Sequence, residues 1–332
     1  MPPNSYLNLA DLGDLVPQTE QKIRVAILGC GMMGQEHISY ISGYDDLQID
    51  FLCDPHEPSL ETSLKVLEDF HSSSSSSNSL PALFHDEKDL LARASEIDLL
   101  VIASPNYLHT SSLKLWGLHD LTILVEKPVA VSAEQVATLR QLRDSPEFCA
   151  RVWVAMEYRY IPAIAKLLEL LPTIGDLRMV TIRENRYPFL HKIGAWNRDR
   201  AKTGDTLVEK CCHFFDLFRL ITGKENNHGR GVQAIAQRGI NYHHEEFQYE
   251  QPILDSAFVV MPLESHQEQQ QRAGKMTSPT TMACLELCMF AEGSRHQEEV
   301  IVTGTKVRTC CQHTHTHTHT HTHTHTHMTT MD

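Results

Sequence analysis

The sequence lacks the features that mark secreted, membrane-spanning and nucleic-acid-binding proteins. No apolar run is long enough to span a bilayer. No basic residue precedes Lys22, so the start has neither the charged end of a secretory signal nor the arginines of a transit peptide. The 29 Lys and Arg residues face 42 Asp and Glu residues, and a net charge of −13 argues against general binding to nucleic acid or to a membrane surface. We therefore expect a cytoplasmic protein whose residues 1–21 form a flexible leader.

Paired cysteine motifs are missing as well. The nine cysteines are odd in number, irregularly spaced and include no C-x-x-C pair, so they predict reduced thiols rather than a disulfide framework. What the chain does have is length. Its 332 residues, of which 41% are hydrophobic and 21% charged, suffice for two domains with a sizeable core.

The first stretch that points to a chemistry begins with an apolar run at 23–27, which predicts a buried parallel strand. It leads into the G-x-G-x-x-G turn Gly29-Cys30-Gly31-Met32-Met33-Gly34, which opens a helix. Gly29 permits the tight turn, Gly31 lets a pyrophosphate approach the backbone, and Gly34 lets the helix pack on the strand. The helix N-terminus offers free N–H groups to the phosphates. Because Asp54 follows about 20 residues on, the pattern favours a dinucleotide site over a glycine-rich turn of another α/β protein.

Strands and helices alternate up to residue 156. The alternation predicts right-handed crossovers and a parallel, doubly wound sheet in a domain spanning residues 22–156. Further strands are expected at 48–54, 82–84, 98–103, 122–125 and 150–156, and helices at 35–42, 59–70, 86–94, 110–118 and 132–143. The serine-rich run 71–79 predicts a flexible loop, with a phosphoserine tract as the alternative.

Long alternating strands replace this pattern in residues 157–306. They predict a second α/β domain with an open antiparallel sheet that is covered on one face. The expected strands lie at 176–187, 232–242, 255–262, 281–291 and 298–303, the helices at 161–171 and 206–221, and a polar surface loop at 264–279.

The sheet pattern is expected to stop after Lys306, which leaves residues 307–332 as a low-complexity tail. A strict His-Thr alternation fills His313–His327. Neutral imidazoles bind zinc, copper or nickel, so one interpretation is a metal-binding tract. The other, which we favour, is translation of a CA repeat in the gene, because no turns or carboxylates frame the imidazoles. In that case the second domain is truncated.

Two polar segments follow expected strands of the first domain. Ser104-Pro105-Asn106 and His109 come after the strand at 98–103, and Glu126-Lys127-Pro128 comes after the strand at 122–125. The carboxyl ends of parallel strands are where doubly wound sheets bind ligands, so we expect all of these residues to contact a cofactor. Lys127 would hydrogen-bond both the nicotinamide side and a substrate hydroxyl. By residue type alone, a solvated ion pair is the stronger alternative.

A third candidate lies on the expected helix 206–221. Glu209 and His213 are spaced i, i+4, which puts them on one helical face, and Asp216 follows where it would orient the imidazole. A histidine titrating near neutrality suits removal of a proton from an alcohol as hydride leaves. A core histidine is the alternative. We predict no metal here, because the adjacent Cys211 and Cys212 point apart on a helix.

Together these motifs resemble the Gfo/Idh/MocA family of NAD(P)-dependent oxidoreductases over residues 22–306. The matching segments are GCGMMG, SPNYLH, EKP, EYRY and TLVEKCCHFFDLFRLITG. The resemblance implies a Rossmann domain, an α/β domain with an open antiparallel sheet, and sugar or polyol substrates. It implies that Lys127 binds substrate and relays a proton, and that His213 is the general acid/base. Glu209 stands where the family often has aspartate.

Further positions follow from the same resemblance. Arg159 with Tyr158, and Trp196-Asn197-Arg198, are expected to contact substrate, with packing at the domain junction as the alternative for the first pair. Gly204-Asp205 stands where the family often has two glycines. Because the open sheet face often forms the subunit contact, the resemblance also implies a homo-oligomer.

Asp54 also bears on the choice of cofactor. Its carboxylate would accept hydrogen bonds from the adenosine ribose and repel a 2′-phosphate, and no arginine follows closely, so NAD is favoured over NADP. The sequence thus predicts hydride transfer between a sugar- or polyol-type CH–OH group and NAD, with no nucleic-acid or membrane partner. Two other functions stay open: a catalytically inactive NAD-binding regulatory relative, and a metal-binding protein acting through the His-Thr tract.

Overall fold

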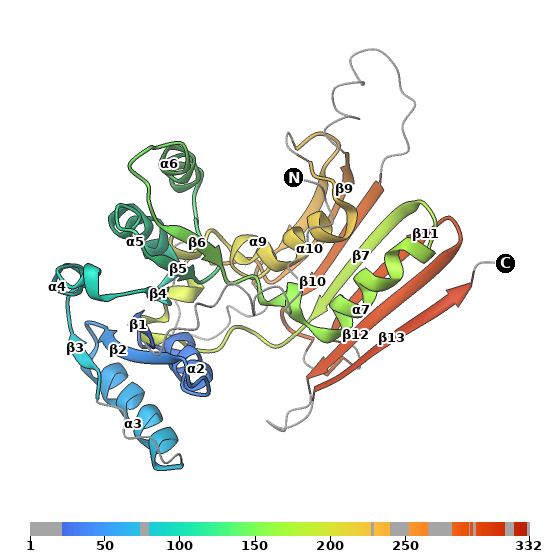
Figure 1. Cartoon of the computed structure of the whole chain (residues 1–332). Helices are drawn as coiled ribbons and strands as arrows, with labels where there is room; N and C mark the ends of the chain where they lie inside the picture. Colours follow the sequence, from blue (N-terminus) through green and yellow to red (C-terminus); the bar gives the residue numbers. More distant parts are fainter. Residues whose placement is uncertain are drawn as a thin grey trace. The chain divides into compact units, whose positions relative to one another are not determined.

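The computed structural model of the chain describes residues 22–73, 80–226, 229–239, 252–264, 281–291, 293–294, 297–315 and 322–330. The expected leader, most of the serine-rich run, nearly all of the polar loop and the end of the expected strand 232–242 lie outside these residues. The chain divides into two compact units, Met1–Ala155 (unit 1) and Met156–Asp332 (unit 2) (Figure 1).

Unit 1 is built on a six-stranded parallel sheet with the order β3-β2-β1-β4-β5-β6, which confirms the doubly wound fold. The strands are β1 (Ile23–Leu28), β2 (Leu47–Cys53), β3 (Ala82–Phe84), β4 (Leu99–Ile102), β5 (Thr122–Val125) and β6 (Arg151–Val154). The helices are α2 (Met32–Ile41), α3 (Glu57–Ser73), α4 (Glu87–Leu91), α5 (His109–Trp116) and α6 (Ala133–Arg143).

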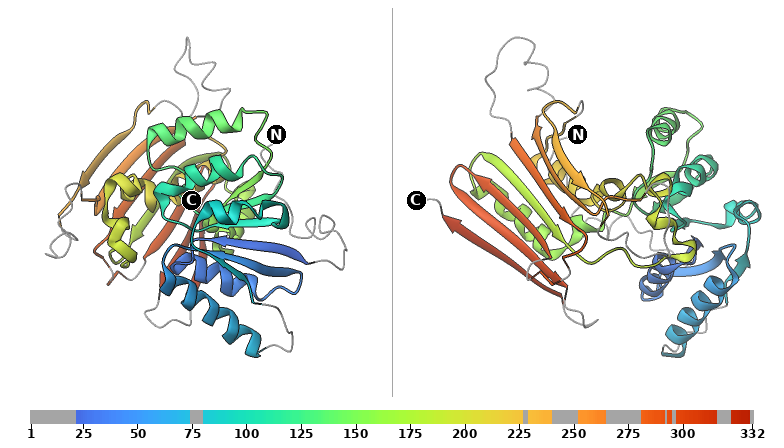
Figure 2. Two further views of the ribbon diagram at one scale, coloured as in Figure 1. Left: turned by 90° about the vertical axis from the view of Figure 1, so that its left-hand side faces the viewer. Right: turned by 180° about the vertical axis from the view of Figure 1, so that it is seen from behind.

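Apolar side chains cover both faces of this sheet, because its central strands carry consecutive apolar residues. Val25 and Ile27 of β1 share one core with Ile38 of α2. Ala26 and Leu28, which alternate with them, belong to a separate core. Figure 2 shows α2 and α3 on one side of the strands and α5 and α6 on the other. Among the described residues of the whole chain, no helix is both long enough and apolar enough to cross a membrane.

Unit 2 is built on a seven-stranded sheet with the order β13-β12-β11-β7-β10-β9-β8. The strands are β7 (Leu177–Asn185), β8 (Gln233–Gln237), β9 (Ser256–Leu263), β10 (Thr281–Cys288), β11 (Glu298–Gly304), β12 (Val307–His315) and β13 (Thr322–Thr330). The helices are α7 (Pro162–Leu170), α8 (Arg200–Thr203), α9 (Thr206–Glu209) and α10 (Cys212–Thr222), with 3₁₀ turns η3 (Glu157–Tyr160) and η5 (Ile193–Arg198). Neighbouring strands are antiparallel except β7 and β10, so the expected open sheet is confirmed with one parallel pair.

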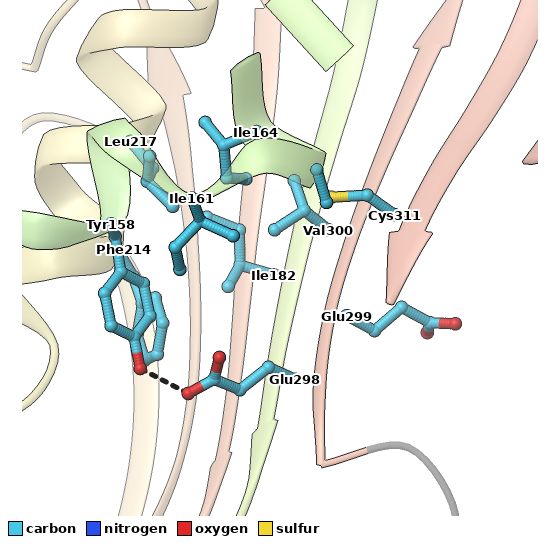
Figure 3. Close-up of a pocket in the computed structure, with 11 residues that line it drawn as sticks. Tyr158, Ile161, Ile164, Ile182, Phe214, Leu217, Glu298, Glu299, Val300 and Cys311 are labelled. Atoms are coloured by element: carbon cyan, nitrogen blue, oxygen red, sulfur yellow. Dashed lines mark hydrogen bonds between the residues drawn. The ribbon is translucent and has the colours of Figure 1, made fainter. Parts of the chain in front are cut away.

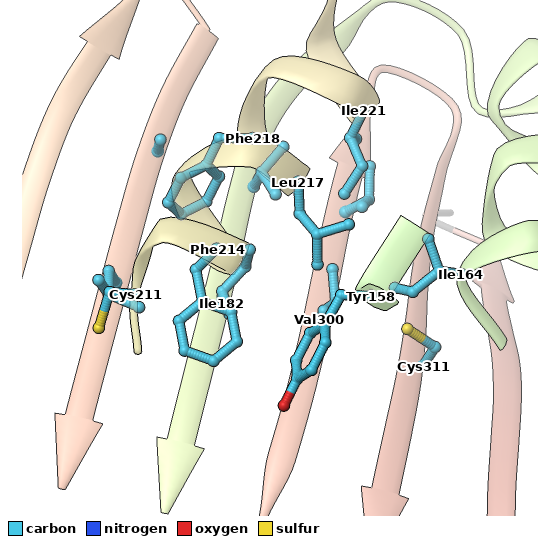
Figure 4. Packing of buried hydrophobic residues seen from close by; sticks show 14 of the residues in the cluster. Tyr158, Ile164, Ile182, Cys211, Phe214, Leu217, Phe218, Ile221, Val300 and Cys311 are labelled. Atoms are coloured by element: carbon cyan, nitrogen blue, oxygen red, sulfur yellow. The ribbon is translucent and has the colours of Figure 1, made fainter. Parts of the chain in front are cut away.

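The core of unit 2 lies between this sheet and helices α7 and α10. Ile182 of β7 and Val300 of β11 pack with Ile164 of α7 and with Phe214 and Leu217 of α10, all fully or nearly buried (Figure 4). Each buried apolar side chain of this size contributes about 1.5–3 kcal/mol relative to exposure. This packing fixes η3 and α10, which carry the candidate site of unit 2.

The sheet continues beyond Lys306, contrary to the sequence prediction. Strand β12 follows β11 directly, and Val307, Thr309 and Cys311 are buried. Strand β13 pairs antiparallel with β12 from Val307↔Thr330 to His315↔Thr322. The alternation of buried positions that begins at Val307 is typical of a half-buried strand. The low-complexity repeat that follows obscures this alternation in the sequence, and threonine itself favours strands.

Candidate active site

The glycine turn joins β1 to α2, and each of its glycines has a separate steric reason. Gly29 has φ +98°, and a Cβ there would lie 2.5 Å from the backbone N of Ser104 at the end of β4. A Cβ on Gly34 would lie 2.0 Å from the Gly29 carbonyl oxygen, so the helix packs directly on the turn. A Cβ on Gly31 would meet nothing within 4 Å. The turn therefore borders open space at the one glycine where a pyrophosphate would approach.

Asp54 follows β2 and is held against this turn. Its carboxylate accepts hydrogen bonds from the backbone N–H of Cys30, at 2.7 Å, and of His56, at 2.8 Å. Met32 and Met33 begin α2, whose N-terminus has no side-chain cap. The helix thus keeps uncapped N–H groups next to the open space. The predicted turn residues and Asp54 lie together at the carboxyl edge of the unit 1 sheet.

The loop after β4 carries two buried polar atoms that stand out. Ser104 Oγ and Asn106 Nδ2 are buried, and no hydrogen-bond partner for either is present among the described residues. Pro105 separates the two residues and leads into a 3₁₀ turn. An unsatisfied buried polar group costs about 1–3 kcal/mol. Both atoms therefore fit groups that bind a ligand at this edge.

His109 connects the loops that follow β4 and β5. Its ring is fully buried, with Nδ1 2.8 Å from the Pro128 carbonyl oxygen and Nε2 2.8 Å from the Ser104 carbonyl oxygen. Burial lowers the pKa of the imidazole, against hydrogen bonds to Pro128 and Ser104 that favour its charged form. The structure thus gives His109 a role in holding the two loops, and its direct contact with a cofactor stays a prediction.

His37 of α2 is a site residue to which sequence reasoning gave no role. Its Nε2 lies 2.8 Å from Glu126 Oε1 at the end of β5, and the other Glu126 oxygen accepts a hydrogen bond from the Lys127 N–H at 3.2 Å. Burial opposes ionisation of Glu126, but the hydrogen bond and charge of His37 outweigh it and hold the pKa of Glu126 below its ordinary value. Rossmann topology, which puts the start of α2 and the end of β5 at one edge, is the signal that points to such a pair.

In unit 2, the expected single helix 206–221 is wrong, because α9 ends at Glu209 and α10 begins at Cys212. The N–H of Cys211 donates to the Thr206 carbonyl oxygen at 3.2 Å, five residues back, and this widened turn separates the two helices. Glu209 and His213 therefore do not share a face of one continuous helix. Both side chains are nonetheless buried, at 5% and 2% exposure.

His213 lies in the first turn of α10, in contact with η3. Its imidazole stacks on the Tyr158 ring, with 4.4 Å between centroids and 14° between planes. Its Nε2 lies 3.7 Å from Glu157 Oε1. Asp216, the expected orienting acid, instead accepts a two-pronged hydrogen bond from the Arg159 guanidinium. Tyr158 is thus the ring that faces the imidazole, and Arg159 is engaged with Asp216.

The predicted substrate residues 196–198 lie in η5 and hold the preceding loop. Asn197 is buried and donates to the Leu190 carbonyl oxygen at 2.7 Å, and Arg198 donates to the Phe189 carbonyl oxygen. Trp196 lies with its ring centroid 4.7 Å from Lys192 Nζ. These contacts are structural, and the predicted contact with substrate stays a prediction.

A buried charged cluster beside Tyr158 was also missed from the sequence. Lys210, in the turn between α9 and α10, contacts Tyr158, Glu184 and Glu298. Figure 3 shows the Tyr158–Glu298 hydrogen bond at the end of an apolar pocket lined by side chains of α7, α10 and the sheet. Glu184 follows Ile182 by two residues along β7, so strand alternation already puts a carboxylate on the buried face. Among the described residues, no group of three or more His, Cys, Asp or Glu is placed to hold a metal ion.

Comparison with known families gives two matches that together span most of the chain. Residues 23–152 match the NAD-binding Rossmann domain of the Gfo/Idh/MocA oxidoreductase family. Residues 170–330 match the C-terminal alpha/beta domain of the same family. The second match extends over β12 and β13, in agreement with the continuation of the sheet.

Individual relatives are distant. Inositol 2-dehydrogenase of Rhizobium meliloti is 24% identical over 209 residues, which are 61% of this chain and 56% of that protein. Glucose-6-phosphate 3-dehydrogenase of Bacillus subtilis is 24% identical over 200 residues, 58% of this chain and 52% of that protein. The crystal structure of the WlbA dehydrogenase from Bordetella pertussis, in complex with NADH and UDP-GlcNAcA, aligns with TM-score 0.66 and 18% identity over 87% of this chain and 78% of that one. The alignments thus span about half the length of the curated relatives.

Proposed function

Because the chain belongs to the Gfo/Idh/MocA family of oxidoreductases, we propose that it transfers hydride between a sugar- or polyol-type CH–OH group and a nicotinamide dinucleotide. The observation that carries the proposal is the carboxyl edge of the unit 1 sheet. There Gly31 borders open space, Asp54 lies against the same turn, and Ser104 and Asn106 present buried polar atoms that lack a described partner. These residues fit a dinucleotide, with its phosphates on the N-terminus of α2.

NAD is the favoured cofactor. A carboxylate at Asp54 accepts hydrogen bonds from ribose hydroxyls and repels a 2′-phosphate. Its two hydrogen bonds, from Cys30 and His56, leave lone pairs on both oxygens for that purpose. Both donors are backbone N–H groups, so no arginine or lysine neutralises the acid through these contacts.

Two residues carry the proposed proton chemistry. When bound, the nicotinamide supplies the hydride acceptor or donor. Lys127 binds the substrate hydroxyl and relays its proton, and His213 acts as the general acid/base that takes or returns it. The Glu157 carboxylate lies 3.7 Å from His213 Nε2. Glu209 is kept as the candidate supporting acid only because it stands where the family often has aspartate.

The substrate class is proposed from the relatives, whose names include inositol 2-dehydrogenase and glucose-6-phosphate 3-dehydrogenase. Arg159 and the segment 196–198 are kept as candidate substrate contacts.

A homo-oligomer formed through the open sheet face is also proposed, because Met179, Phe258 and Met282 are exposed on unit 2 strands. A cytoplasmic location is consistent with the absence of any disulfide among the nine cysteines, all of which lie in described residues.

The test is NADH formation by the purified chain with a panel of inositols, hexose phosphates and nucleotide sugars, with NAD and NADP compared. We expect turnover with NAD and its loss in both Lys127→Ala and His213→Ala, whereas Lys114→Ala, on the exposed side of α5, retains it. Wild-type turnover in both site variants contradicts the assigned roles. NAD binding by calorimetry without turnover on any substrate favours the inactive regulatory relative.

A further inference from the structure

Lys210 is buried among acidic and aromatic groups of unit 2. Its side chain is 8% exposed, and Nζ lies 3.2 Å from Glu184 Oε1 and 3.5 Å from Glu298 Oε1. Nζ also donates to the Tyr158 hydroxyl and lies 5.4 Å from the centroid of the Phe214 ring. Lysine is almost never buried unless it is paired, so these contacts hold its ammonium in one place.

Burying such a cluster of charged groups costs free energy of desolvation. The desolvation penalty in proteins is several kcal/mol for each buried ion, and apolar replacements of buried ion pairs are often neutral or stabilising. Here Glu184 and Glu298 face the Lys210 ammonium, Arg186 Nη1 lies 3.5 Å from Glu184 Oε1, and Glu184 Oε2 is buried with no hydrogen-bond partner among the described residues. Stability alone therefore does not explain the arrangement, and its contacts with Tyr158 point to a positional role.

Tyr158 joins the cluster to the imidazole of His213. Its hydroxyl donates to Glu298 and accepts from Lys210, which fixes one end of the side chain (Figure 3). Its ring meets the edge of Phe214, with 5.7 Å between centroids and 68° between planes. The face of the same ring stacks on His213 at 4.4 Å. A change at the hydroxyl end therefore reaches the imidazole through a single rigid ring.

We propose that Lys210 is a positioning residue: together with Glu298 it clamps the Tyr158 hydroxyl, and the clamped ring sets the plane of the His213 imidazole. The catalytic consequence rests on the proposed function, in which His213 transfers a proton. The orientation itself does not, because it belongs to the free protein. Loss of the clamp should lower kcat by about ten- to a hundredfold through misorientation, while the KM for NAD stays unchanged.

The experiment follows the His213 ring protons by NMR in protein with labelled histidine, the signal being assigned by its loss in His213→Ala. A stacked tyrosine shifts these protons upfield. Lys210→Met removes the ammonium and keeps an apolar stem, and Tyr158→Phe keeps the ring and removes the clamped hydroxyl. We expect both variants to lose most of the upfield shift.

Arg183→Met is the matched control. Arg183 also bridges two glutamates, Glu286 at 2.8 Å and Glu299 at 2.9 Å, and among the described ion pairs it joins neither Glu184 nor Glu298. Its removal is expected to leave the His213 signal in place. A loss of the upfield shift in this control as large as in Lys210→Met would mean that any broken ion pair disturbs the site, and the proposal would be wrong.

The outcomes separate this proposal from the proposed function. An unchanged His213 signal in Lys210→Met overturns the positioning role, and if that variant fails to fold, an unchanged signal in Tyr158→Phe does so. If the His213 signals of both variants differ from those of the wild type, but the wild type turns over no substrate, the positioning role is supported and the dehydrogenase proposal is contradicted. If the wild type turns over substrate, and both variants keep the wild-type His213 signals and the wild-type kcat, the dehydrogenase proposal is supported and the positioning role is contradicted.

Discussion

The imidazole of His37 and the carboxylate of Glu126 lie 2.8 Å apart and tie helix α2 to the end of strand β5. The pair is largely buried, with side chains 19% and 10% exposed. Because Glu126 directly precedes Lys127, this hydrogen bond stabilises the segment that carries the proposed substrate-binding lysine. Its removal has a predictable cost and a predictable pH dependence.

His37→Ala should lower the free energy of unfolding by about 1–3 kcal/mol at neutral pH, because a buried carboxylate loses a hydrogen-bond partner. The folded pKa of Glu126 lies below its ordinary value of 4.5, so this stabilisation is present above pH 4.5 and is lost as pH falls through the folded pKa. Urea unfolding of both proteins at neutral and acidic pH measures it. His85→Ala, which removes an exposed pair with Glu57 at 3.4 Å, is the control and should change stability by about 0.5 kcal/mol or less. Equal losses in the two variants would contradict the prediction.

Gly31→Ala and Gly34→Ala should separate cofactor binding from folding. A Cβ at Gly31 meets no atom within 4 Å, so the protein should keep its Tm while the added methyl group obstructs the pyrophosphate and raises the Kd for NAD by about tenfold or more. A Cβ at Gly34 would lie 2.0 Å from the Gly29 carbonyl oxygen, so that variant should lose stability even without ligand. Calorimetry with NAD and thermal unfolding distinguish the two. Unaltered NAD affinity in Gly31→Ala would contradict the assignment of the glycine turn as the pyrophosphate site.

The free energy of unfolding should depend on pH through the ionisation of the buried Glu184 carboxyl. Burial is the main cause that raises the pKa of its carboxyl from 4.5 to about 7, against the opposing charge of Lys210. Between these two values the folded state holds a proton that the unfolded state has lost, so the contribution of Glu184 to stability is greatest below pH 4.5 and is lost as pH rises through about 7.

Glu184→Gln should remove up to about 3 kcal/mol of that fall, a value given by the shift at 1.36 kcal/mol for each pKa unit. Denaturant unfolding across this pH range measures the slope. A steeper or unaltered slope in Glu184→Gln would contradict the prediction.

Asp205 has a left-handed backbone conformation that favours glycine. It has φ +82°, and its carboxylate accepts hydrogen bonds from the N–H groups of Thr206 and Leu254, at 2.8 and 2.6 Å, and from Arg238 at 3.0 Å. Asp205→Ala should destabilise by about 2–4 kcal/mol because it keeps the strain and loses the bonds. Asp205→Gly should cost less, since glycine removes the strain. Equal destabilisation in urea unfolding would show that the strain is negligible.

Much of unit 1 could be predicted from the sequence, because its signals are local. The glycine turn and the apolar run of β1 each depend on neighbouring residues, and the structure has both. His37 and Glu126 show where local reasoning ends. They are 89 residues apart, and only the sheet topology brings them together.

The site in unit 2 was harder to predict for the same reason. The break before α10 depends on a wide turn at Cys211, which helical periodicity cannot reveal. The parallel pairing of β7 with β10 joins segments about a hundred residues apart, and alternation within each strand is the same for either direction. Lys210 directly follows Glu209 in a stretch that predicts one helix, and its glutamate partners come from two distant strands.

The transfer of deuterium tests the dehydrogenase proposal most directly. The substrate that turns over in the panel is prepared with deuterium on the carbon that bears the reacting hydroxyl, and the NADH produced is analysed by NMR. Direct hydride transfer predicts deuterium at C4 of the nicotinamide, with no such product in His213→Ala. Deuterium released to water, or no NADH from any substrate of the panel, would contradict it.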